Sequence, residues 1–140
     1  MQIPDVAKIG KWVKNNVKYN INYSGRSEIT ATDTINNLEG VCEHITLLYN
    51  ALVYSLGYKV IYVSGYVIDK KDYFVKDDGH AWSLIKIGEK WLPFDATWGI
   101  FSGKLPISHI FKSYSKREYN VTGYDYINIG KVIIKGIYLG

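Results

Sequence analysis

A single cysteine lies at the start of the most apolar helical stretch of the chain. Cys42 follows Gly40 and Val41 and is the only cysteine in 140 residues, so no intramolecular disulfide can form. The first turn of a helix presents unpaired N–H groups and a partial positive charge, which lower a thiol pKa from its ordinary value of about 8.5. The N–H groups at Cys42 could also receive the oxyanion that forms when a thiolate attacks a carbonyl. Cys42 is therefore a candidate nucleophile, with an inert buried thiol as the alternative.

A histidine and an aspartate mark the outer ends of two predicted strands that a tight turn joins. His80 stands in Gly-His-Ala-Trp after a polar loop, and Asp95 stands in Phe-Asp-Ala-Thr-Trp-Gly. A hairpin centred next to Gly88 would place His80 directly opposite Asp95. Cross-strand partners have β-carbons about 4.5–5.5 Å apart, which suits a carboxylate that orients an imidazole. The pattern predicts that Asp95 aligns His80 as a base.

Three further residues could contact a substrate or its oxyanion. His44 lies two residues after the cysteine, and the indole N–H groups of Trp82 and Trp98 follow the two motifs closely. Each also has a simpler interpretation. His44 could be a surface residue or could support the triad residues without contacting substrate. The two tryptophans could simply pack beside the site. The histidines at 44, 80 and 109 lack the two-histidine helical spacing of metallopeptidases, so we expect no metal and no cofactor.

Helical patterns fill the first part of the chain. Apolar residues recur every three or four positions over residues 4–17, and residues 20–28 are polar and turn-forming. A short helix should then begin at Thr30 or Thr32, bury Ile35 and Leu38, and end at Gly40. From Cys42 an apolar stripe continues to residue 56, which predicts a central, buried helix followed by a glycine.

Strand patterns follow. Residues 60–68 are β-branched and aromatic and interrupted at Gly65, which predicts a strand with a bulge there. After a charged loop over 69–79, residues 80–87 and 91–95 predict a hairpin. Residues 108–115 are expected to be helical and residues 127–139 β-rich. Helices first and an antiparallel sheet afterwards is an α+β arrangement.

The composition is that of one globular domain over residues 1–140. Hydrophobic residues make up 47 % and charged residues 21 %, and the net charge of +4 is scattered rather than gathered into a basic stripe. Thirteen tyrosines could stack on bases, but several fall within core-like stretches. No run approaches the roughly 18 apolar residues that span a bilayer, and no signal peptide is visible. We expect a cytoplasmic protein that binds neither membranes nor nucleic acid; its oligomeric state is open.

Together the three motifs resemble the Cys-His-Asp blocks of the transglutaminase-like superfamily. Gly-Val-Cys at a helix start, Gly-His-Ala-Trp and Phe-Asp-Ala-Thr-Trp-Gly occur in the family's order, and the similarity covers about residues 5–100. The resemblance implies a papain-like fold, with Cys42, His80 and Asp95 as the catalytic triad. Residues 101–140 match no known pattern and are expected to extend the sheet.

The residues and the resemblance both favour acyl transfer through a thioester. Cys42 would attack an amide carbonyl of a protein or peptide, His80 would act as base and then acid, and Asp95 would hold the imidazole. We expect hydrolysis, as in a peptidase or amidase, rather than cross-linking to an amine, although the same triad serves both. The alternative of another class is a binding or scaffold domain that keeps the fold with little turnover.

Overall fold

The computed structural model describes residues 2–22, 31–67, 79–106 and 108–115. Helix α1 (Gln2–Asn16) forms where the apolar residues recur with a helical period. Val6, Ile9 and Val13 fall on one side of it and are fully buried. The predicted first helix is confirmed.

Helix α3 (Cys42–Ser55) lies at the centre of the molecule, as predicted. All ten residues from 44 to 53 are buried, because α1, α2 and the sheet all pack against this helix. The hydroxyl of Tyr49 donates to the backbone oxygen of Val6 at 2.9 Å and ties α3 to α1. Gly57, with φ of +97°, lets the chain leave the helix in the left-handed region.

The short second helix ends earlier than the sequence predicted. Helix α2 (Ala31–Asn37) stops before Leu38, which has φ of +53° and is 38 % exposed instead of buried. Gly40 belongs to β2 (Glu39–Gly40), which pairs in parallel with β1 (Lys18–Tyr19). The backbone oxygens of Leu38 and Gly40 accept N–H groups from the β1 segment, and this pairing takes the chain out of the helix.

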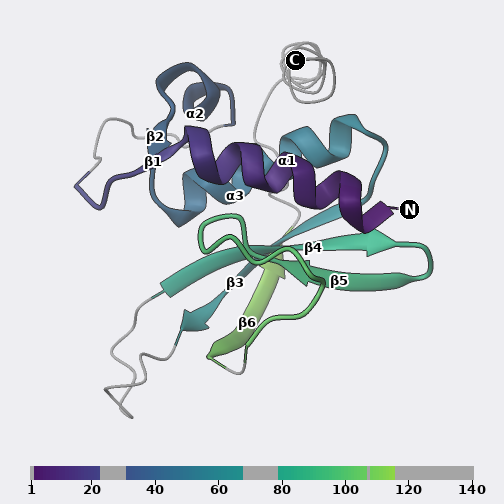
Figure 1. Ribbon diagram of the computed structural model, residues 1–140. Coiled ribbons are helices and arrows are strands. Elements are labelled where there is room, and N and C mark those ends of the chain that lie inside the picture. Colours follow the sequence, from purple (N-terminus) through teal and green to yellow (C-terminus); the bar gives the residue numbers. More distant parts are fainter. Residues whose placement is uncertain (1, 23–30, 68–78, 107, 116–140) are drawn as a thin grey trace.

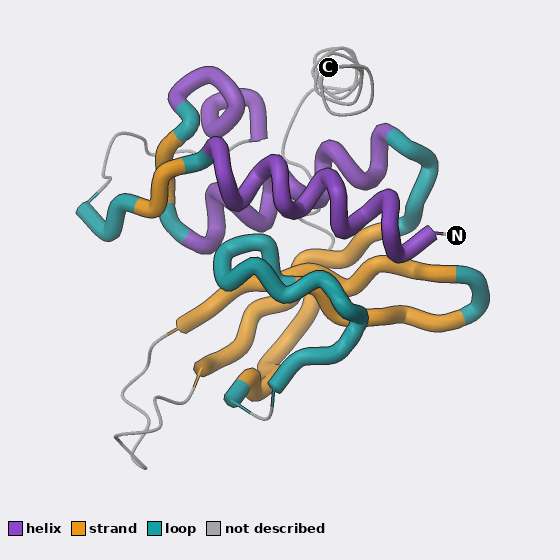
Figure 2. Tube along the Cα trace, viewed as in Figure 1, coloured by secondary structure: helices purple, strands orange, loops and turns teal. Residues whose placement is uncertain are grey.

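Four antiparallel strands form the main sheet, in the order β5-β4-β3-β6. They are β3 (Val60–Val67), β4 (Gly79–Ile87), β5 (Lys90–Phe94) and β6 (His109–Ser115). The pairing of β3 with β6 shifts register between Ser64 and Gly65, and the extra residue is Lys112 of β6. The irregularity thus occurs at Gly65 as predicted, but the bulged strand is the partner of β3. The helices lie together on one side of this sheet (Figures 1 and 2), so the α+β fold class is confirmed.

Residues 108–115 are not helical, contrary to the sequence prediction. From His109 onward they form β6, which pairs with the free side of β3 and extends the sheet. Ile110, Phe111 and Tyr114 are residue types that favour strands, and the unpaired edge of β3 supplies the hydrogen-bond partners. The expected loops around 23–30 and 69–78 and the β-rich stretch 127–139 lie outside the described residues.

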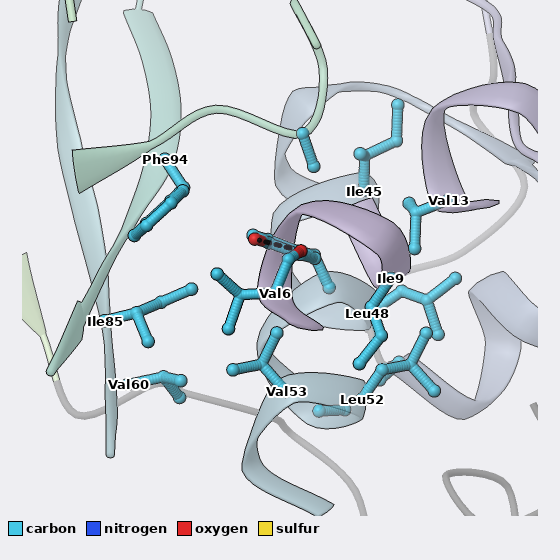
Figure 3. Packing of buried hydrophobic residues seen from close by; sticks show 14 of the residues in the cluster. Val6, Ile9, Val13, Ile45, Leu48, Leu52, Val53, Val60, Ile85 and Phe94 are labelled. Carbon is cyan, nitrogen blue, oxygen red and sulfur yellow. Dashed lines mark hydrogen bonds between the residues drawn. The ribbon is translucent and has the colours of Figure 1, made fainter. Parts of the chain in front are cut away.

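The core lies between the helices and the sheet. In Figure 3, Phe94, Ile85 and Val60 point from the strands toward Val6 and Val53 of the helices. Near the start of α3, Cys42 packs against a second, smaller cluster formed by the buried residues Leu47, Tyr62 and Ala81. Within the described residues, none of the helices combines the length and the apolar character that a membrane span needs.

Candidate active site

Cys42 is the first residue of α3 and carries a free, half-buried thiol. The preceding Val41 has an extended backbone and no side-chain acceptor for the first-turn N–H groups. Cys42 therefore lies at the N-terminus of a buried helix, where unpaired N–H groups and the positive end of the helix dipole are found.

His80 connects the thiol to a buried carboxylate. Its Nε2 lies 2.7 Å from Oδ2 of Asp95, and the side chain and charge of Cys42 also act on the ring. Because Nε2 faces the carboxylate, the remaining nitrogen, Nδ1, is the one available to the sulfur. Burial lowers the pKa of His80, but the hydrogen bonds and negative charges of Asp95 and Cys42 outweigh it and raise the pKa to about 9.

Three N–H groups converge on the Asp95 carboxylate, which is fully buried. Oδ1 accepts the backbone N–H of Trp98 at 3.0 Å. Oδ2 accepts from His80 and from His109, each at 2.7 Å. Burial raises the pKa of this carboxyl, but the hydrogen bonds and charge of His80, with the donors of His109 and Trp98, leave it below its usual value. The carboxylate is thus held ionised.

The predicted hairpin forms with a different register. Ile87 pairs with Lys90 and Ser83 with Phe94, because Gly88, with φ of +63°, closes a tight two-residue turn. Continued by one residue, this register sets Asp95 level with Trp82 instead of His80. The error is two residues, an even number, so Asp95 stays on the same face as His80 and reaches it diagonally. The predicted contact between His80 and Asp95 therefore forms, although the register of the hairpin was predicted wrongly.

His109 belongs to the site, although the sequence analysis considered it only as a metal ligand. Strand β6 brings it beside β3, and its side chain is 2 % exposed with Nε2 on Asp95. A strand interpretation of residues 109–115 would have been needed to find it. His80, Asp95 and His109 each offer a ligand atom within 4.8 Å of the others, so they are the described residues that could hold a metal ion.

His44 has a structural role in place of the suggested contact with substrate. It is buried, and its Nδ1 accepts the backbone N–H of Val41 at 3.0 Å. This bond caps the N-terminus of α3 from within. A β-carbon on Gly40 would lie 2.4 Å from the β-carbon of His44, so the glycine leaves room for the cap.

The two tryptophans surround the imidazoles. Trp82 is buried with its ring 5.1 Å from that of His109, and Trp98 is 45 % exposed with its ring 5.4 Å from that of His80. Trp82 thus packs beside the site, its simpler interpretation. Trp98 covers the site from the solvent side, and an oxyanion contact by either indole stays a prediction.

Polar contacts fix α3 against β4 beside the site. One turn after Cys42, the Thr46 hydroxyl donates to the backbone oxygen of Ala81 at 3.2 Å. One turn further, the Asn50 side chain accepts from Ser83. Residues four apart share one face of a helix, so the face that carries the thiol is held in register with the strand that carries His80.

A pocket of about 630 Å³ opens next to His80. Its walls include the side chains of Lys14, Tyr19, Ile21, Val67, Thr97 and Trp98. The pKa of Tyr19 is raised by partial burial and by the charge of Cys42. The sequence analysis missed Tyr19, since its place depends on the pairing of β1 with β2.

Comparison with known proteins agrees with this arrangement. Residues 2–96 match the family model of the transglutaminase-like superfamily. A crystal structure of a candidate cysteine protease from Cytophaga hutchinsonii is similar, with a TM-score of 0.65 and 31 % identity over 81 % of this chain. The match covers 36 % of that protein, so this chain spans little more than a third of its length. No curated protein sequence matches significantly. On the extent of the family match, the chain belongs to the transglutaminase-like superfamily.

Proposed function

We propose that the chain is a cysteine-nucleophile acyl-transfer enzyme that acts on amide bonds of peptides or proteins. The observation that carries the proposal is the hydrogen-bonded pair of His80 and Asp95, with Cys42 close enough to contribute to the raised pKa of His80. A thiol at a helix N-terminus, an imidazole beside it and a buried carboxylate behind the imidazole are the parts that nucleophilic catalysis requires.

In the first half of the reaction, the thiolate of Cys42 attacks the amide carbonyl carbon. The C–S bond forms, and negative charge moves to the carbonyl oxygen next to the N–H groups at the start of α3. His80 then passes its Nδ1 proton to the leaving nitrogen, and the C–N bond breaks to give a thioester and a free amine. Asp95 keeps the imidazole oriented and stabilises its positive charge without taking the proton.

In the second half, His80 accepts a proton from the nucleophile that attacks the thioester. Water releases a carboxylic acid, and an amine forms a new amide; in both cases the C–S bond breaks and the thiolate returns. We propose water as the acceptor, because the similar crystal structure is described as a candidate protease. Cross-linking to an amine is the second candidate, supported by the name of the family.

The pocket favours an extended peptide with bulky apolar side chains. Ile21 is 78 % exposed and Trp98 is 45 % exposed on its walls, next to the buried imidazole. Exposed apolar groups beside an ionised site are typical of substrate grooves.

Mass spectrometry of a peptide library, incubated with and without a primary amine, tests the proposal. Backbone cleavage, or conversion of side-chain amides to acids, would support hydrolysis. Loss of ammonia with gain of the amine would support cross-linking. Cys42→Ala is the matched control, and every product should disappear with it. A library left unchanged by the wild type, or changed equally by Cys42→Ala, would contradict the proposal and favour a binding domain.

A further inference from the structure

We infer that His109 is a positioning residue of this site: its imidazole N–H holds the Asp95 carboxylate in place for His80. The inference rests on the proposed function, because His109 has a triad to position only if Cys42 and His80 act as proposed. It assigns to β6 an indirect part in the geometry of the nucleophile, through Asp95 and His80.

Both imidazoles use one carboxylate oxygen. Nε2 of His80 and Nε2 of His109 each lie 2.7 Å from Oδ2 of Asp95. An ionised carboxylate can only accept hydrogen bonds, so both nitrogens must carry the proton. The other nitrogen of His109, Nδ1, lies 3.3 Å from the hydroxyl oxygen of Ser108, which can donate to it. His109 is therefore fixed in the tautomer that donates to Asp95.

The two histidines nevertheless differ in the group that lies next to their second ring nitrogen. The second nitrogen of His80 is the one left for the Cys42 thiol, whose side chain acts on this ring, whereas that of His109 faces Ser108. His109 can thus act on the nucleophile only through Asp95 and His80. Its ring is locked between the edges of Trp82 and Trp98, with centroids 5.1 and 4.8 Å away.

Without the His109 donor, the carboxylate would keep the Trp98 N–H on Oδ1 and only His80 on Oδ2. The second donor on Oδ2 restrains the carboxylate, so that it does not follow the motion of the His80 ring. Without that donor, the orientation of His80 toward Cys42 would be less defined, and the imidazole would take the thiol proton less readily. Hydrogen-bond partners behind a ligating or catalytic group typically change activity by about 10- to 100-fold.

The test compares two variants through the alkylation rate of Cys42 by iodoacetamide as a function of pH. His109→Gln keeps an N–H donor near the position of Nε2, whereas His109→Phe keeps the ring and removes the donor. Below the ordinary thiol pKa of about 8.5, we expect His109→Phe to react about tenfold more slowly than wild type and His109→Gln to stay close to it. Above that pH the three rates should converge, because any thiol is then ionised.

Two results would overturn the role of His109 and leave the proposed function intact. One is a wild-type profile in His109→Phe; the other is an equal loss in both variants, which would mean that packing and not the donor matters. A wild-type Cys42 that reacts like a free thiol at every pH would instead remove the proposed function, and the inference with it.

If His109→Phe does not fold, the wild-type protein still decides. The chain has three histidines, so their ring nitrogens can be assigned in ¹H–¹⁵N spectra. The inference requires a proton on Nε2 of His109. The opposite tautomer would overturn it.

Discussion

At Asp95, three N–H donors stabilise the negative charge of a carboxylate that has no contact with solvent. An isolated buried charge is costly, and here each oxygen has at least one donor. The donors come from β4, β6 and the turn after β5. The carboxylate therefore fixes the relative positions of three segments as well as the tautomer of His80.

Replacing this carboxylate by an amide tests that dependence. In the variant Asp95→Asn, the side chain would have one oxygen for donors that approach two, so one N–H would always face the amide NH₂ group. We expect Asp95→Asn to lower the free energy of unfolding by about 1–3 kcal/mol. We also expect slower turnover, by up to about 10⁴-fold as in triads that lose their carboxylate. Urea unfolding and the peptide assay measure the two effects; turnover at the wild-type rate would contradict the role of Asp95.

The sequence allowed the contact between His80 and Asp95 to be predicted, but not the residues that support it. Cys42, His80 and Asp95 stand in local motifs whose spacing is informative. Tyr19 and His109 are placed at the site by strand pairings with segments that are distant in the sequence. The residues adjacent to them in the sequence give no indication of those pairings. His44 could not be distinguished from a substrate contact, because its capping role depends on the backbone at Val41.

Among the elements, α3 and β4 carry the nucleophile and the base, so the register of their contact matters. Thr46 and Asn50 follow Cys42 at intervals of one helical turn and bind β4 at Ala81 and Ser83. These hydrogen bonds are specific, whereas apolar packing alone would permit the helix to slide.

We expect Thr46→Val to weaken this contact at nearly constant shape. The lost hydrogen bond should lower the free energy of unfolding by about 1 kcal/mol and slow the alkylation of Cys42. Thr97→Val is the matched control, because the Thr97 hydroxyl is buried without a hydrogen-bond partner and its removal should be neutral or stabilising. Equal effects of the two substitutions in urea unfolding would contradict the assignment.

Gly65 is expected to be irreplaceable in β3. A β-carbon there would lie 2.2 Å from the backbone oxygen of Ile110 and 2.3 Å from the ring of Trp82. Gly65→Ala should therefore push β6 or Trp82 away and lower the free energy of unfolding by about 1–3 kcal/mol. Gly79→Ala is the control, since a β-carbon at Gly79 meets no atom within 4 Å. A Gly65→Ala protein as stable as that control would show that the sheet accommodates the methyl group.

Helices and strands were predicted correctly where the sequence pattern of the segment itself determines its structure. They were predicted wrongly where pairing with another strand determines it. The period of α1 and the apolar stripe of α3 are visible locally. The end of α2 and the strand β6 are set by pairing with β1 and β3, and a seven-residue segment offers too little pattern to overrule a helical interpretation.

For the whole molecule, the paired ionised groups make stability depend on pH. The pKa of His80 is about 9 in the folded protein against an ordinary value of 6.5, so the folded state binds this proton more tightly. Its contribution to stability is complete below about pH 6.5 and is lost as the pH rises toward 9. Asp95 has a lowered pKa, so its contribution is present above its ordinary pKa of 3.8 and is lost as the pH falls through its folded-state value.

Urea unfolding of wild type and His80→Gln across this range measures the effect. We expect the free energy of unfolding of the wild type to fall between pH 6.5 and 9 more steeply than that of the variant. Parallel curves would mean that His80 has no such pKa shift in the folded protein.

The alkylation rate of Cys42 at pH 7 is the most direct measure of whether fold and site together activate a nucleophile. A free thiol is only a few per cent ionised at that pH, so an activated one should react faster. We predict that iodoacetamide labels folded wild type about tenfold faster than the same chain unfolded in urea, and that His80→Gln loses most of this difference. Equal rates in the folded and unfolded wild type would contradict the account.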